Sequence, residues 1–215
     1  MKRALLFTSI TVLMLLSCCF GASGQSRYGI MGGFSFSHAT EVGNRGSVTK
    51  YNAGVTYQLK LPLGFSVQPS LLYHVKGARV KGDGGTTLDL TAGYLELPVS
   101  FQWGPDLLLF RPFLDVSPYI GVGLNNSLSC RAQGSKVADE TNIWGGAGIA
   151  RMEYGVGVGL GVEIWRFQII GRYNWNLGKI YCGSDAATPA NTIMKTTFGD
   201  GGNFSGLTLS VALLF

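Results

Sequence analysis

Apolar and polar residues alternate along eight segments of this chain. In the segment Leu207–Phe215, large apolar residues occupy every second position, and mostly smaller or more polar residues lie between them. Successive side chains of a β-strand point to opposite faces, so each segment predicts a strand with one apolar and one polar face. The eight predicted strands are Tyr28–His38, Tyr51–Leu61, Phe65–Val75, Leu88–Trp103, Phe113–Asn126, Glu153–Ile164, Phe167–Trp175 and Leu207–Phe215.

The connections between these strands alternate in length. Three are short, at 62–64, 104–112 and 165–166, and four are longer, at 39–50, 76–87, 127–151 and 176–202. Short turns on one side and long loops on the other are typical of outer-membrane barrels, in which the short turns face the periplasm. An even number of strands can close without a free edge, as a bilayer requires. We therefore predict an all-β fold, an eight-stranded antiparallel transmembrane up-and-down β-barrel.

A soluble lipocalin-like barrel is the alternative, and it would have apolar residues inside and polar residues outside. Here the second face carries Gly, Ser, Thr, Asn, Gln and charged residues, which suits a polar lumen. Aromatic residues near strand ends suit the girdles of a membrane interface. They are Tyr73, Trp103, Trp165, Phe167 and Trp175.

The N-terminal segment has the pattern of a secretory signal. Lys2 and Arg3 precede an apolar stretch over 4–16, and Ala22, Ser23 and Gly24 offer a small-residue cleavage site. The apolar stretch is shorter than the about 20 residues that a membrane-spanning helix needs. We predict a cleaved signal peptide at 1–24 and one domain at 25–215. A lipoprotein signal ending at Leu16-Ser17-Cys18 is the alternative.

Composition agrees with an exported barrel and argues against nucleic-acid binding. The net charge of +5 is small and scattered, and it falls to +3 once Lys2 and Arg3 are removed. The 32 glycines lack a collagen period and suit a strongly twisted, crowded lumen. We expect a monomer in contact with outer-membrane lipid.

Three strand positions should be irregular. Leu88 and Leu90 are out of phase with the apolar face that follows them, which predicts a bulge near 91–93. Pro98 and Pro118 lack the backbone donor of a strand ladder, and we interpret both as bulges.

Several segments match short motifs of a known family. They are Tyr94–Val99, similar to Y-L-E-I-P-L; Arg111–Phe113 and Pro118–Gly121, similar to K-P-Y and G-P-Y-x-G; Gly157–Glu163, similar to G-x-G-x-G-x-E; and the pair Arg172-Tyr173. In these segments the chain resembles the PorT-like, porin-family outer-membrane β-barrel domain. The resemblance covers nearly all of 25–215 and implies the fold, but it implies no activity. One departure is Met31, where the family often has lysine.

Catalytic and metal chemistry have little support in the sequence. His38 and His74 are the only histidines, both near the outer ends of predicted strands, and no His or Cys spacing matches a metal site. A rim hydrolase or acyltransferase could combine His74 with Asp83 or Asp89 and a serine, but the sequence defines no triad. We predict no enzyme, no cofactor and no metal, with the histidines at the interface or in loops.

Charged residues on the polar face are the main candidate site. They are Lys60, Glu96, Asp115, Glu163 and Arg172, which the strand phase directs into the lumen. An eight-stranded barrel is only wide enough for its own side chains, and unpaired charges there are costly. We expect these residues to pair with one another and plug the lumen, with Arg172 as the critical member. A charge-selective conduit is the alternative.

The long loops carry the remaining functional candidates. Cys130 and Cys182 are the cysteines outside the signal, and they lie in neighbouring loops of an oxidising compartment, which predicts a disulfide. The last two long loops also contain Trp144, Arg151, Lys179 and Lys195. The expected function is a structural, binding or adhesion role through external loops that contact an extracellular ligand or a host surface protein. A transport role is the alternative, either as a narrow channel or, as the resemblance to the PorT-like family implies, as an accessory of protein secretion.

Overall fold

The computed structural model describes residues 26–39, 45–46, 48–81, 87–132, 135–141, 144, 150–179 and 204–215. The predicted signal peptide at 1–24 lies outside these residues. The described chain forms one antiparallel sheet of ten strands, and eight of them close into a barrel. The eight are β1 (Ser26–Ala39), β3 (Val48–Lys60), β4 (Phe65–Lys81), β5 (Thr87–Trp103), β6 (Arg111–Ala132), β8 (Met152–Ile164), β9 (Phe167–Asn176) and β10 (Phe204–Leu214).

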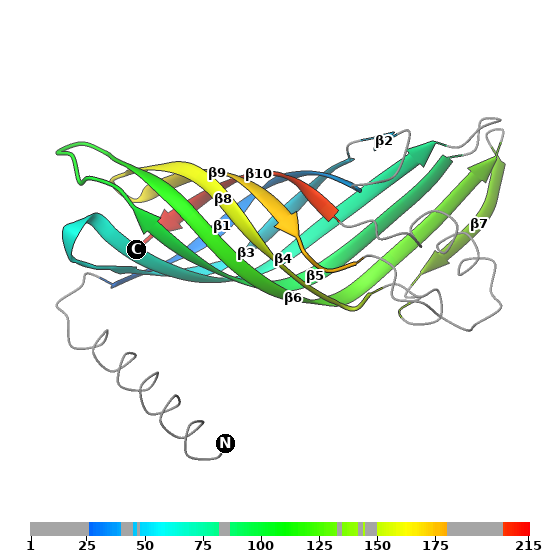
Figure 1. The fold of residues 1–215 in the computed structure, drawn as a ribbon, viewed down its shortest axis with the longest axis horizontal. Helices are drawn as coiled ribbons and strands as arrows, with labels where there is room; N and C mark the ends of the chain where they lie inside the picture. Colours follow the sequence, from blue (N-terminus) through cyan, green and yellow to red (C-terminus); the bar gives the residue numbers. More distant parts are fainter. Residues whose placement is uncertain are drawn as a thin grey trace, which may run out of the picture.

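Each barrel strand pairs with the strands before and after it, and β1 pairs with β10 to close the ring. This is the predicted eight-stranded up-and-down barrel. Two short strands lie outside the ring: β2 (Arg45–Gly46) pairs with β4, and β7 (Ser135–Thr141) pairs with β6. Figure 1 shows β7 at one end of the barrel and the C-terminus at the other. The short turns, including the 3-10 turn η1 (Pro62–Gly64), lie at the C-terminal end, which faces the periplasm in barrels of this class.

The two faces of each strand have the polarity of a membrane barrel. On β10, Leu207, Leu209 and Val211 are exposed on the outer face, while Thr208 and Ser210 are buried in the lumen. The same alternation continues round the ring, so the outside is apolar and the inside is largely polar. It confirms the strand phases that the sequence predicts and contradicts the lipocalin-like alternative.

The strands extend further at the external end than the sequence predicts. β4 continues to Lys81, so much of the expected loop 76–87 is strand. β6 continues to Ala132 and forms a hairpin with β7, so Cys130 lies on a strand instead of in a loop. Beyond the membrane the outer face of a strand need not be apolar, so the alternating pattern fades before the strand ends.

The expected irregularities are partly right. The β5–β6 register shifts between Gly93 and Tyr94, next to the predicted bulge. The bulges expected at Pro98 and Pro118 are wrong, because Pro98 pairs with Tyr119 and Pro118 with Val156 in registers that continue unchanged on both sides. The β5–β6 ladder skips residue pairs near these prolines, so the strands accommodate the missing backbone N–H donors without an inserted residue.

None of the helical segments that the structure describes is long and apolar enough to cross a membrane.

Candidate functional site in the barrel lumen

Charged side chains in the lumen form three groups along the barrel, which we call the external cluster, the central pair and the periplasmic cluster. The external cluster consists of His74 and Lys76 from β4, Glu96 from β5 and Glu153 from β8, all with side chains no more than 6% exposed. The Lys76 Nζ lies 2.7 Å from Glu96 Oε1 and 3.0 Å from Glu153 Oε2. The His74 Nδ1 lies 2.9 Å from Glu96 Oε2. The Lys76 ammonium group thus forms ion pairs with two buried carboxylates.

Polar and aromatic neighbours surround the external cluster. Asn176 donates a hydrogen bond of 3.0 Å from Nδ2 to Glu153 Oε2. The Lys76 Nζ lies 4.7 Å from the ring centroid of Tyr119 and 5.8 Å from that of Tyr94, distances that allow cation–π attraction. These contacts hold the lysine away from water on several sides.

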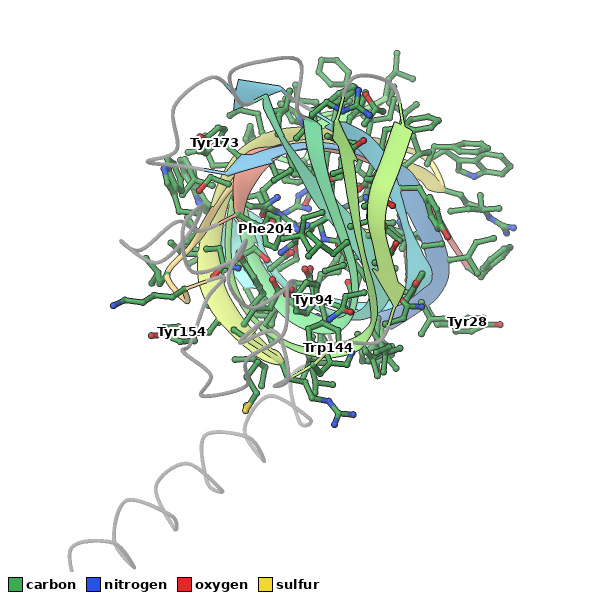
Figure 2. The ribbon with its side chains drawn as sticks, turned by 90° about the vertical axis from the view of Figure 1, so that its right-hand side faces the viewer. Tyr28, Tyr94, Trp144, Tyr154, Tyr173 and Phe204 are labelled. Carbon is green, nitrogen blue, oxygen red and sulfur yellow. The ribbon has the colours of Figure 1, made fainter. Side chains whose placement is uncertain are left out.

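Trp144 packs near the external mouth. Its ring centroid lies 5.9 Å from that of Tyr94, at an interplanar angle of 70°. Figure 2 looks into the barrel from this end and shows the two rings together within the ring of strands. A Cβ at Gly123 would lie 2.2 Å from the Trp144 indole, so only glycine allows this approach. The tryptophan therefore narrows the mouth above the external cluster.

The central pair joins Arg172 on β9 to Asp115 on β6. The Arg172 Nε donates to Asp115 Oδ2 at 2.7 Å, and its Nη2 donates to Ser100 Oγ at 2.8 Å. Asp115 is 0% exposed. A Cβ at Gly157 would lie 2.4 Å from Arg172 Cδ, so the glycine leaves room for the arginine side chain. From β9, Arg172 therefore bonds to two other strands, β6 through Asp115 and β5 through Ser100.

The periplasmic cluster is centred on Glu163, at the end of β8. Its Oε1 lies 2.8 Å from both Arg27 Nη1 and Lys60 Nζ. Its Oε2 accepts a hydrogen bond of 3.0 Å from Gln58 and lies 3.5 Å from Arg111 Nη1. Three cationic side chains therefore share one buried carboxylate at this mouth.

A layer of amides fills the lumen between the central pair and the periplasmic cluster. Gln68, Gln102 and Gln168 are 0–1% exposed. Gln102 donates to Gln68 Oε1 at 3.0 Å, and Gln168 donates to Gln102 Oε1 at 3.3 Å. Gln68 also donates to Thr56 Oγ1 at 2.9 Å. Nearer the external end, a cavity of about 10 Å³ beside His74 and Lys76 has room for about one water.

The structure places all five charged residues from the sequence analysis in the lumen, but in separate groups. Lys60 lies with Glu163, Arg172 lies with Asp115, and Glu96 belongs to the external cluster. Sequence reasoning missed five further members of these groups: Arg27, His74, Lys76, Arg111 and Glu153. The signal was present for all five. His74 and Glu153 lie on the polar faces of predicted strands, and extending the strand phases past the expected ends directs Arg27, Lys76 and Arg111 inward.

His74 differs from its expected position at the interface or in a loop. It is buried in the lumen against Glu96. Asp89, an alternative catalytic partner, instead accepts a hydrogen bond of 3.3 Å from Arg79 Nη2. Asp83 and the His38 side chain lie outside the described residues. Among the residues that the structure describes, no group of His, Cys, Asp and Glu side chains could hold a metal ion.

The predicted disulfide stays a prediction, because Cys182 and the side chain of Cys130 lie outside the described residues. We expect alkylation of unreduced protein to label neither thiol, and labelling of both after reduction. The bridge would stabilise the external end by roughly 2 to 4 kcal/mol. A Cys130→Ser variant is the control, because it should leave one thiol that reacts without reduction. Labelling of both cysteines in unreduced protein would refute the bridge.

The lumen and the lipid-facing exterior define a small outer-membrane barrel, and sequence comparison supports this class. Residues 21–181 match the family described as the outer membrane protein beta-barrel domain, and the chain belongs to this family. It is therefore an outer-membrane β-barrel protein. The match does not single out the PorT-like group. No curated protein matches the chain.

Several solved structures are similar at low sequence identity. Neisserial surface protein A matches at 12% identity and a TM-score of 0.45, over 88% of this chain and 97% of that one. Ail of Yersinia pestis, in complex with the heparin analogue sucrose octasulfate, matches at 10% identity and a TM-score of 0.43, over 89% of this chain and 99% of that one. The N-terminal barrel domain of Pseudomonas aeruginosa OprF matches at 11% identity and a TM-score of 0.33, over 90% of this chain and 100% of that one.

Proposed function

We propose that this protein is a monomeric outer-membrane barrel with a plugged lumen, which binds a ligand or a surface protein through its external loops. The main support is the layer of Gln68, Gln102 and Gln168, which fills the lumen and is bonded across it. Charged groups on either side of this layer are paired. A solute path would have to break buried hydrogen bonds and ion pairs, which is costly.

The external end supports a binding role. Arg151 and Lys179 are exposed where β8 begins and β9 has ended, so they offer cationic contacts outside the membrane. Trp144 is engaged with Tyr94, and Lys195 lies outside the described residues. In this proposal 1–24 is a signal peptide that is removed on export, and 25–215 is the mature domain.

Planar-bilayer recording tests the plugged lumen. We expect the unmodified protein to give no stable ohmic conductance, because amides and ion pairs obstruct the lumen. A variant with Gln68→Ala, Gln102→Ala and Gln168→Ala should show a small leak, since it empties the amide layer while leaving the wall intact. Heat-dependent migration in a denaturing gel checks that both proteins are closed barrels.

The alternative is a narrow transport channel or an accessory of protein secretion. Its support is the resemblance of Tyr94–Val99 and Gly157–Glu163 to the PorT-like group. Stable ohmic conductance of the unmodified protein would overturn the plugged barrel and favour transport.

A further inference from the structure

The turn between β5 and β6 exposes an unusual run of apolar side chains. Leu108 is 105% exposed and Leu109 is 83% exposed, and their neighbours Leu107 and Phe110 are also exposed. Turns are normally rich in Gly, Pro, Asn, Asp and Ser. These side chains contribute little to the barrel's own packing, and consecutive exposed apolar residues indicate an interaction site.

Two backbone amides and the one carboxylate of this turn have partners within the protein. The Leu107 amide donates to the Phe110 carbonyl at 3.1 Å, and the Gly104 amide donates to the carbonyl of Gly64 in the neighbouring turn at 3.0 Å. The Asp106 carboxylate lies 3.4 Å from the Nε of Arg111. These bonds fix part of the turn, while the side chains of Leu108 and Leu109 remain exposed.

An apolar groove begins at the base of the turn. It has a volume of about 320 Å³ and lies across the ends of β5, β6 and β8. Leu114 and Leu160 form part of its wall, and both belong to the exposed, lipid-facing band.

We propose that this groove binds an acyl chain of a glycerophospholipid from the inner leaflet of the outer membrane, with the Leu107–Phe110 turn inserted in that leaflet. The groove continues the band that already contacts acyl chains, and the turn lies at the end that faces the periplasm (Figure 1). A periplasmic protein could reach the turn, but the wall at Leu114 and Leu160 faces the bilayer. A lipid reaches both parts at once.

The next periplasmic turn adds groups that suit a lipid headgroup. β6 pairs Arg111 with Glu163, which sets the β8–β9 turn beside the groove. Trp165 in that turn is exposed, and the guanidinium of Arg166 lies 5.1 Å from its ring. Tryptophan is favoured at membrane interfaces, and arginine suits a phosphate group.

Fluorescence quenching tests the inserted turn. A bimane label at Leu108→Cys, in a background with Cys130→Ser and Cys182→Ser, is placed in vesicles of phosphatidylethanolamine and phosphatidylglycerol that contain brominated lipid. We expect at least twofold quenching at Leu108, and similar quenching at Leu209→Cys on the lipid-facing wall. The control Lys179→Cys, at the external rim, should change little. An unquenched label at Leu108 overturns insertion and leaves the turn available to a periplasmic protein.

Native mass spectrometry tests the groove. Protein released from the same vesicles should keep one phospholipid, and Leu160→Trp, which fills the groove, should lose it. Leu209→Trp makes the same change on the lipid-facing wall of β10 and should keep the lipid. Equal retention by both variants overturns the groove site. Leu114→Phe is a second filling variant if Leu160→Trp does not give a heat-modifiable barrel.

Discussion

Replacing Lys76 by methionine is expected to destabilise the barrel by about 3 to 5 kcal/mol. The ammonium lies between Glu96 and Glu153, at 2.7 and 3.0 Å, and all three side chains are buried. Methionine keeps much of the side-chain length but leaves two carboxylates without the cation that compensates their desolvation. The free energy of unfolding, measured in urea from vesicles, should fall by this amount.

Two comparisons separate lost charge compensation from a general effect of the substitution. Arg79→Met removes an exposed cation that pairs with Asp89 on the same hairpin, and it should cost under about 1 kcal/mol. Adding Glu96→Gln and Glu153→Gln to Lys76→Met should restore much of the stability, because the buried charges are then gone. Equal losses for the Lys76 and Arg79 variants would contradict the importance of the external cluster.

The alternating pattern predicts the strands well, because each strand records locally which side faces lipid and which faces the lumen. It predicts the strand ends poorly at the external side. The pattern predicts a loop at Lys76 because the apolar outer positions become sparse there, although β4 continues to Lys81. For Glu153 the sequence predicts the inward orientation but not the ion-pair partner, because Lys76 is 77 residues away along the chain.

Strand phase also gives the face of a side chain without its height in the barrel. Height depends on the tilt of the strands and the stagger between them, which arise when the ring closes. Glu96, Asp115 and Glu163 all point inward, yet they lie in three groups with different cations. For the same reason, the sequence could not reveal that Arg27 on the first strand meets Glu163, 136 residues later.

The exposed turn at Leu107–Phe110 was visible in the sequence as a short apolar run between predicted strands. Periodicity alone cannot distinguish an apolar turn from the start of a buried strand. The structure resolves this, because the turn's backbone bonds to itself and to Gly64 while its side chains remain exposed. Such a run is therefore informative only after the strand ends on both sides are known.

Replacing Arg172 by alanine is expected to cost about 3 to 5 kcal/mol of unfolding free energy. Its Nε bonds to Asp115 at 2.7 Å, and Asp115 is 0% exposed, so the variant leaves a carboxylate buried without its cation. Ser100 can offer only a neutral hydroxyl in its place. Urea unfolding in vesicles measures the loss, and bilayer recording tests whether the vacated space next to Gly157 admits cations past the buried Asp115 carboxylate.

Combining Asp115→Asn with Arg172→Ala distinguishes the cost of a buried unpaired charge from the cost of lost packing. Asparagine removes the charge, so the double variant should be more stable than Arg172→Ala alone, and any cation leak should diminish. If the two variants are equally unstable, the cost comes from the cavity beside Gly157, not from the carboxylate. An Arg172→Ala barrel that resists urea as well as the parent would show that the central pair contributes little to stability. Asp115 would then accept hydrogen bonds from water or from another donor in the lumen.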